Sequence, residues 1–217
     1  SSLFEGVVQR LSIFEGRVRS AGDDAPAAWW TSRYHRWRRN ERAGLLASIR
    51  HVRLPEQTVG GSLAKVGSEL ERGLLAQLFL HQPAGRVFDL TGDGDGANRI
   101  HYKRRWSYFL LFTDFVPGVW DSEGQEREPS ELKDLDVIPD LDASALLAVY
   151  SSSLFWWYFS VFTDNRNVNR RDLAAFPLPD LDTRTHLELA ALGVELMHEL
   201  RACAEVRTCS YESVGTI

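Results

Sequence analysis

The sequence predicts an α+β fold, with mixed sheet elements around a buried aromatic helix and an amphipathic helix near the C-terminus. Residues 143 to 163 carry no charged side chain and many large apolar ones. A helix that is apolar on every side must be buried nearly all round. Short apolar segments bounded by glycine and proline precede it, which is typical of strands. Leucines at helical spacing follow from residue 181.

The composition permits a folded core and excludes several classes of protein. The 217 residues suffice for one large domain or one and a half small ones. Because the formal net charge is −5, nucleic-acid binding must come from local basic patches. Cys203 and Cys209 offer no disulfide framework and no paired zinc spacing, which fits a reduced, cytoplasmic setting. The sequence begins with Ser1 rather than methionine and shows no signal peptide, so we interpret it as part of a longer protein.

The first third of the chain predicts short elements. Residues 4 to 14 alternate loosely and predict a strand or hairpin arm whose sheet lies largely upstream. Residues 41 to 49 predict a short helix, and residues 52 to 54 predict a strand that ends at a proline. Apolar residues near helical spacing predict an amphipathic helix over residues 62 to 81.

The first basic cluster lies between residues 29 and 42, where aromatic side chains are interleaved with cations. Basic and aromatic groups together suit phosphates and exposed bases. We predict DNA contacts here because so many neighbouring cations repel one another unless an anion is present. The alternative is a solvated face whose arginines pair with acidic neighbours. The predicted DNA-binding residues are Arg33, Arg36, Arg38, Arg39 and Arg42.

A second basic cluster begins the segment from 99 to 115, which predicts one long strand or a pair of strands. The first half of this segment is basic, and residues 108 to 112 have the apolar pattern of a core strand. An edge strand protected by its charges is the alternative to DNA binding. The predicted DNA-binding residues are Lys103, Arg104 and Arg105.

Turn-rich segments lie on both sides of this second cluster. Residues 86 to 90 predict a short strand, and a glycine- and aspartate-rich turn follows at 91 to 97. This turn is no calcium loop, because the twelfth position of that pattern is Ile100 rather than glutamate. Residues 117 to 139 are acidic and are expected to face solvent, away from any nucleic acid. Residues 137 to 141 predict a strand that leads into the central helix.

The central apolar segment could be a membrane helix or a core helix. Residues 143 to 163 are long enough to span a bilayer. Serines at 151 to 153 interrupt the segment, and acidic residues flank it without a basic anchor at its start. We therefore predict a core helix with Asp142 as its N-cap, and no membrane partner. A final amphipathic helix is predicted over 181 to 206, with an apolar face formed by Leu187, Leu189, Leu192, Leu196 and Leu200.

A polar loop at residues 164 to 171 is the third candidate site. Asparagine and arginine make paired hydrogen bonds to adenine and guanine edges, so we predict base reading from this loop. Asn169, with Asp172 three residues on, has the layout of a helix cap. An Asx-rich turn held by its own main-chain bonds is the alternative. The predicted DNA-binding residues are Asn165, Arg166, Asn167, Arg170 and Arg171.

Three stretches of the sequence resemble one family and cover most of the chain in the family's order. They are SLFEGVVQRLSIF with the later TSRYHRWRRNER, then RIHYKRRWSYFLLFTDFVP, then SSLFWWYFSVFTDNRNVNRRDLAAFPLP. They resemble the end of the methyltransferase domain and the target-recognition domain of large adenine-specific DNA methyltransferases, of the fused restriction-modification and phage-defence type. The Pro-Leu-Pro with its long following helix is similar to the spacer in specificity subunits of multi-subunit restriction enzymes.

This resemblance implies a domain organisation and a function. Residues 1 to 55 would be trailing strands of the methyltransferase domain, 56 to 180 the target-recognition domain, and 181 to 217 a spacer helix and tail. The function would be sequence-specific recognition of double-stranded DNA for S-adenosylmethionine-dependent methylation of an adenine, which is flipped out of the stack. The alternative is a protein–protein interaction module of a multi-subunit assembly.

The family's catalytic motifs are missing from this sequence. It contains no Asn/Asp-Pro-Pro-Tyr/Phe loop, and its glycine-rich stretch at 91 to 97 has no following helix that would make it a cofactor loop. Catalysis and S-adenosylmethionine binding are therefore expected in a methyltransferase domain upstream. No catalytic, cofactor-binding or metal-binding residue is predicted here, and the chain is expected to be inactive alone.

Overall fold

The computed structural model describes residues 28–35, 39–54, 62–88, 98–105, 109–208, 210–211 and 215–216. For Arg39, Arg42 and the residues after 208, the description covers the main chain only. The predicted strand at 4 to 14 and the turn at 91 to 97 lie outside the described residues. The chain forms two compact units, one of residues 1–80 and 160–164 and one of residues 81–159 and 165–217. Each unit is described by itself below.

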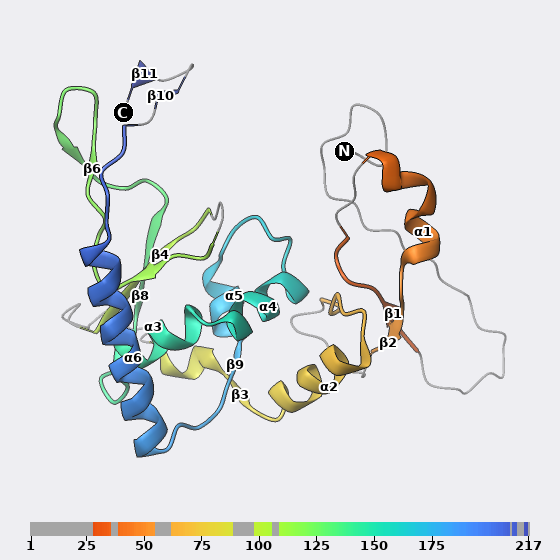
Figure 1. Ribbon diagram of the computed structural model, residues 1–217. Coiled ribbons are helices and arrows are strands. Elements are labelled where there is room, and N and C mark those ends of the chain that lie inside the picture. Colours follow the sequence, from red (N-terminus) through yellow and green to blue (C-terminus); the bar gives the residue numbers. More distant parts are fainter. Residues whose placement is uncertain are drawn as a thin grey trace. The chain divides into compact units, whose positions relative to one another are not determined.

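The predicted α+β class is confirmed, and every strand pairing among the described residues is antiparallel (Figure 1). Unit 1 contains β1 (Trp30–Thr31), the 3-10 helix η1 (Arg39–Gly44), α1 (Leu45–Ser48), β2 (Val52–Arg53) and α2 (Glu69–Leu78). Unit 2 contains β3 (Gln82–Pro83), η2 (Ala84–Val87), β4 (Arg99–Lys103), β5 (Phe112–Thr113), β6 (Val119–Trp120), β7 (Glu126–Arg127), β8 (Leu132–Asp136), α3 (Ala143–Tyr150), α4 (Ser153–Phe162, whose last three residues belong to unit 1), α5 (Arg170–Ala174), β9 (Pro177–Leu178), α6 (Thr183–Ala202), β10 (Ser210–Tyr211) and β11 (Gly215–Thr216).

In unit 1, the helix predicted near 41 to 49 and the strand near 52 are confirmed, but the helix predicted over 62 to 81 is too long. α2 begins only at Glu69, because the Ser68 hydroxyl accepts a hydrogen bond from the Glu71 N–H at 3.3 Å and caps the helix. The carboxylate of Glu71 is buried and accepts hydrogen bonds from the Gly67 N–H at 2.9 Å and the Ser68 hydroxyl at 3.1 Å. These reciprocal bonds fix the start of α2 at this point.

The sheet of unit 2 has β4 at its centre, with β5 on one side and β8 on the other. The pair of strands predicted within 99 to 115 is therefore confirmed. The acidic segment 117 to 139 is mostly exposed, as expected, and its strand β8 pairs with the basic strand β4 along the whole length of β4. Arg99 donates to Asp136 at 2.6 Å, and His101 Nδ1 lies 2.8 Å from Asp134. Opposite charges on neighbouring strands stabilise this pairing.

Three other strand predictions need correction. The strand predicted at 86 to 90 is mostly the 3-10 helix η2, and Phe88 makes an isolated bridge to Val137. The strand predicted at 137 to 141 lies earlier, as β8. The apolar segment ending at Phe112 is only partly buried, since Phe109 is 62% exposed.

The predicted single helix over 143 to 163 consists of two helices, α3 and α4, bent by 63°. The Ser152 hydroxyl causes the break, because it donates to the Val149 carbonyl at 2.6 Å and accepts from the Phe155 N–H at 3.2 Å. The expectation of burial all round is wrong for Leu154 and Trp156, which are 37% and 36% exposed. Among the described residues, no single helix is long and apolar enough to cross a membrane. α3 and α4 taken together have the length and the apolar composition of a membrane span, but they are bent.

The core of unit 2 is a cluster of aromatic rings with Phe155 at its centre. Phe155 is fully buried, and its ring centroid lies 4.9 Å from that of Tyr150 and 5.2 Å from that of Phe176, both edge to face. Phe112 of β5 stacks on Tyr150 at 5.4 Å, which ties the sheet to the helices. Such ring pairs contribute about 0.5–1.5 kcal/mol each beyond their buried area.

Asp142 caps α3 as predicted, accepting from the Ser144 N–H at 2.8 Å. Asn98 holds the approach to α3: its amide donates to the carbonyls of Ile138 and Leu141 at 2.9 and 2.7 Å, and its oxygen accepts from the Ala143 N–H at 2.9 Å. A side chain that satisfies four main-chain groups, counting a longer bond to the Val137 carbonyl, fixes where α3 leaves the sheet.

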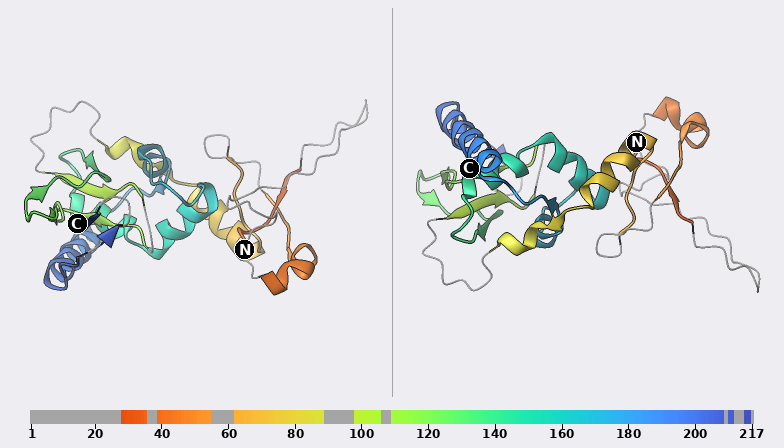
Figure 2. Two further views of the ribbon diagram at one scale, coloured as in Figure 1. Left: turned by 90° about the horizontal axis from the view of Figure 1, so that it is seen from above. Right: turned by 90° about the horizontal axis from the view of Figure 1, so that it is seen from below.

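The predicted C-terminal helix is confirmed as α6, but its packing face differs from the predicted one. Ala190, Gly193 and Met197 are buried, whereas Leu187 and Leu192 are exposed. Within unit 2, α6 packs along α3, and α3 also contacts β4 and β5 (Figures 1 and 2). Small residues on α6 let it approach α3 closely, and Leu189, Leu196 and Leu200 of the predicted face are half-buried.

We expect Gly193→Ala to lower the free energy of unfolding by about 1–3 kcal/mol, the usual cost of overpacking. An added Cβ would lie 1.9 Å from the Ser144 carbonyl oxygen, so α6 would have to move away from α3. Gly73→Ala is the control, since a Cβ there meets nothing within 4 Å and should stabilise α2 slightly. Urea denaturation followed by circular dichroism measures both, and equal stabilities would contradict the close contact.

Candidate nucleic-acid interface

Two of the three predicted basic segments meet in unit 2. The N–H of Val168 donates to the Arg104 carbonyl at 2.7 Å, and Arg105 forms an antiparallel bridge with Asn167. The polar loop therefore runs beside the end of β4, although more than sixty residues of sequence separate them. Six exposed cations result, which we call the basic ridge: Lys103, Arg104, Arg105, Arg166, Arg170 and Arg171.

The asparagines of this loop have different positions from the arginines. Asn165 is buried and has a φ of 53°, in the left-handed region that asparagine tolerates better than most residues. Asn167 is half-buried at the bridge to β4. The predicted cap at Asn169 is confirmed, because its N–H and its Nδ2 both donate to the Asp172 carboxylate, at 3.0 and 2.9 Å. Asn169 and the main chain near Asn165 and Asn167 thus shape the loop, while its arginines are exposed.

Two buried tyrosines hold the far end of α5. Tyr150 donates to the Leu173 carbonyl at 3.2 Å, and Tyr158 donates to the Ala175 carbonyl at 2.9 Å. Burial raises the pKa of both phenols well above the ordinary value, so both remain hydrogen-bond donors over the physiological pH range. The aromatic core therefore supports the helix that begins with Arg170 and Arg171.

The charges along β4 are neutralised at one end only. Arg99 and His101 are paired with the acids of β8. Lys103, Arg104 and Arg105 make no ion pair within the described part of the chain. Arg171 lies 3.5 Å from Asp172 but keeps 87% of its side chain exposed, so this pair is weak. Lys103, Arg104, Arg105 and Arg171 thus present positive charge to solvent on a chain that is negative overall.

The first basic cluster is only partly described. Arg33 lies in unit 1 and donates to the buried carboxylate of Glu71 at 2.8 Å. This contact matches the alternative in which an arginine of the cluster pairs with an acidic neighbour. Arg36 and Arg38 lie outside the described residues, as do the side chains of Arg39 and Arg42. Their part in DNA binding stays a prediction.

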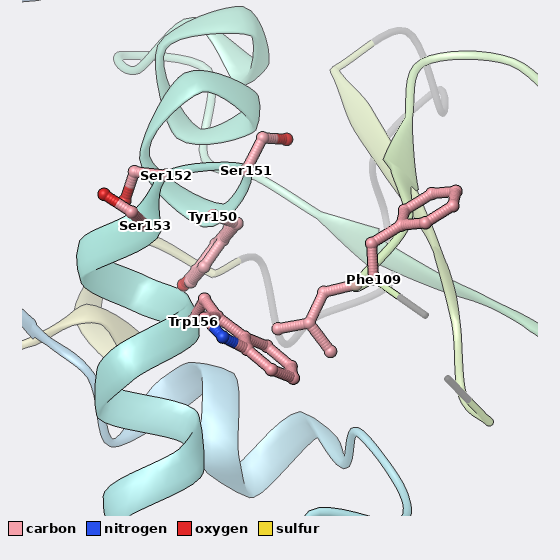
Figure 3. A pocket seen from close by; sticks show the side chains of 7 residues that line it. Phe109, Tyr150, Ser151, Ser152, Ser153 and Trp156 are labelled. Carbon is pink, nitrogen blue, oxygen red and sulfur yellow. The ribbon is translucent and has the colours of Figure 1, made fainter. Parts of the chain in front are cut away.

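A cavity of about 300 Å³ lies at the bend between α3 and α4 (Figure 3). The hairpin of β4 and β5 provides Phe109 and Leu110, α4 provides Trp156, and α3 provides Tyr150, with three serines at the bend. The sequence offered one signal for this feature, the serine run at 151 to 153, but not the exposure of Phe109. Among the described residues, no three His, Cys, Asp or Glu side chains gather as they would around a metal ion.

The residues of this cavity do not suit S-adenosylmethionine. That cofactor carries a sulfonium, an amino group and a carboxylate, yet no charged side chain lines the cavity.

Comparison with known proteins identified no relative of this chain. No family model matches it, and neither a curated protein nor a solved structure is detectably similar to it.

Proposed function

We propose that this chain is the DNA-recognition part of an adenine-specific, S-adenosylmethionine-dependent DNA methyltransferase of a restriction-modification or phage-defence system. The observation that carries the proposal is the meeting of the end of β4 with the loop at 165 to 171, which joins two separately predicted DNA-binding segments into one basic ridge. The sequence resemblance supports the class of enzyme. Catalysis and cofactor binding belong to a methyltransferase domain upstream, in a cytoplasmic protein.

The two parts of the ridge have different roles in this proposal. Lys103, Arg104 and Arg105 contact phosphates, since charge-assisted hydrogen bonds to phosphate give affinity without reading sequence. Arg166 and Arg170 are at the exposed end of the supported loop, and arginine can bind guanine O6 and N7 with two hydrogen bonds. A loop held by β4 and by the tyrosines keeps these donors in place before DNA arrives, which lowers the entropic cost of binding.

The position of Asn165 narrows the set of base-reading side chains. Because Asn165 is buried in a left-handed turn, we assign it to the shape of the loop. Asn167 is half-buried, and its side chain is the one asparagine of the predicted set still placed for contact with an adenine edge. Base reading is accordingly proposed for Arg166, Asn167 and Arg170.

A protein–protein interaction module remains the second candidate, favoured by one specific observation. α6 exposes Leu187, Leu192 and Val194, each more than half exposed. Exposed apolar groups on one helix suit a protein partner better than a phosphate backbone. This function and DNA recognition are distinguishable because they use different faces and respond differently to salt.

The test is the salt dependence of duplex binding by the folded chain. Fluorescence anisotropy with a labelled duplex, between about 50 and 200 mM salt, should show affinity falling steeply, because each phosphate contact contributes about −0.9 to the slope of log K against log salt. Six ridge cations set a limit of about −5 on that slope. Circular dichroism at each salt concentration controls for unfolding. Absence of binding at the lowest salt, or a slope near zero, would contradict the proposal and leave the interaction module.

A further inference from the structure

Two of the aromatic side chains that line the cavity at the bend between α3 and α4 are exposed to solvent. Phe109 is 62% exposed and Trp156 is 36% exposed, although the aromatic core lies next to them. Figure 3 shows Phe109 on the side of the hairpin, and Trp156 and Tyr150 on the side of the helices. Adjacent exposed aromatic side chains are typical of a binding surface. Neither the resemblance nor the basic ridge assigns these residues a role.

Both walls of the cavity are connected to the basic ridge. On one side, the Lys103 N–H donates to the Leu111 carbonyl at 3.1 Å, so the segment that leads from Phe109 and Leu110 into β5 runs back beside the basic end of β4. On the other side, Tyr150 lines the cavity, and its hydroxyl holds α5, which begins with ridge arginines. The cavity and the ridge therefore share supporting elements of unit 2.

The lining suits a flat, uncharged ring. Phe109 and Trp156 offer exposed ring surfaces, Leu110 is apolar, and no charged side chain lines the cavity. Ser152 is occupied at the helix break, but the hydroxyls of Ser151 and Ser153 make no hydrogen bond within the described residues. Such hydroxyls can donate to or accept from a base edge. A volume near 300 Å³ is at the lower limit for ligand pockets, which fits one ring system.

We propose that this cavity receives an unstacked nucleobase from DNA that the basic ridge holds by its phosphates. The inference rests on the proposed DNA-binding function and adds a binding site to it. Ring stacking on aromatic side chains contributes about 5- to 150-fold in affinity for each base and tolerates every base, because each base has a π face. The positive ridge in the same unit favours a nucleic acid over an apolar peptide.

The experiment compares three labelled duplexes: one fully paired, one with a single bulged adenine, and one with an abasic sugar in the bulge. The wild-type chain should bind the adenine bulge at least about 5-fold more tightly than the abasic bulge. Phe109→Ala and Trp156→Ala should remove this difference in affinity. Phe109→Tyr should retain the difference, because it keeps an aromatic ring at this position. Trp120→Ala, at an exposed tryptophan on the β6–β7 hairpin, is the control and should leave it intact.

The outcomes separate this site from the proposed function. Normal binding of paired duplex with no preference for the adenine bulge overturns the cavity site and leaves DNA recognition standing. An equal loss on all three duplexes in Phe109→Ala also overturns it, since the contact would then not depend on a base. No binding of paired duplex overturns the DNA-recognition function, and the cavity site with it. Arg170→Glu/Arg171→Glu should weaken all three duplexes alike.

Discussion

Reversing the charge of two ridge arginines, Arg170→Glu/Arg171→Glu, is expected to lower duplex affinity on the order of 100-fold at 0.1 M salt. Hydrogen bonds to charged groups contribute about 1.5–3 kcal/mol each, and the new carboxylates also repel phosphates. The slope of log K against log salt should become shallower by about 2, since two phosphate contacts are lost. Arg170 and Arg171 begin α5, which the capping box of Asn169 and Asp172 and two tyrosines hold in place.

The matched control reverses the same number of charges elsewhere in unit 2. Arg184 and Arg207 are exposed on and after α6, where they pair with Glu188 and Glu205. Arg184→Glu/Arg207→Glu changes the net charge by the same amount, so it should reproduce any effect of overall charge and nothing more. Equal losses in the two double variants would show that the ridge has no special role, and unchanged affinity in the first would refute the loop assignment.

Phe155→Ala should lower the free energy of unfolding by about 3–5 kcal/mol, the usual cost of removing a buried phenylalanine. Phe155 is fully buried and lies within 5.8 Å, centroid to centroid, of the rings of Phe112, Tyr150 and Phe176. The space left by the missing ring would loosen the packing of the sheet against the helices. Urea denaturation followed by tryptophan fluorescence measures the change.

Leu154→Ala is the control for this core prediction. Leu154 precedes Phe155 on α4 but is 37% exposed, so its truncation should cost no more than about 1 kcal/mol. If the two variants lost similar stability, the ring cluster would not be the centre of the core. Because Tyr150 and Tyr158 also hold α5, Phe155→Ala should in addition weaken duplex binding at temperatures where the protein is still folded.

The main features of the fold followed from the sequence where one local rule decided the outcome. Asp142 and Asn169 were identified as caps because a cap depends on residues only two or three positions away. α6 was predicted from its leucines, yet its packing face uses Ala190, Gly193 and Met197. Periodicity indicates a helix, but close approach to α3 favours small residues over large ones, and hydrophobicity alone does not reveal that.

Two other errors, the start of α2 and the break between α3 and α4, concern polar residues whose effect we judged weaker than that of the apolar pattern. The serine and glutamate at 68 and 71 have the spacing of a capping box, which places the helix start later than the apolar pattern alone suggests. The serines at 151 to 153 were treated as an interruption of a membrane helix, whereas Ser152 ends one helix and begins another. Hydroxyls that compete for main-chain groups override an apolar run.

The candidate site depends on long-range main-chain pairing between β4 and the loop, which no local sequence pattern predicts. The sequence marked Lys103 to Arg105 and the loop at 165 to 171 as separate clusters. Their meeting rests on main-chain bonds of Arg104 and Arg105 with the loop, and main-chain bonds leave no trace in residue type. The exposure of Phe109 was likewise not predictable, because a phenylalanine within an apolar stretch is ordinarily assigned to the core.

The one-sided neutralisation of β4 has a consequence for the charge that an anion at this surface would experience. At physiological ionic strength the screening length is about 8 Å, so a phosphate at the ridge experiences little of the charge on distant parts of the molecule. The acids of β8 lie beside Arg99 and His101, at the end of β4 away from the loop. The isoelectric point of 5.7 is thus a poor guide to what this surface attracts, since attraction is decided within a few residues of one strand end.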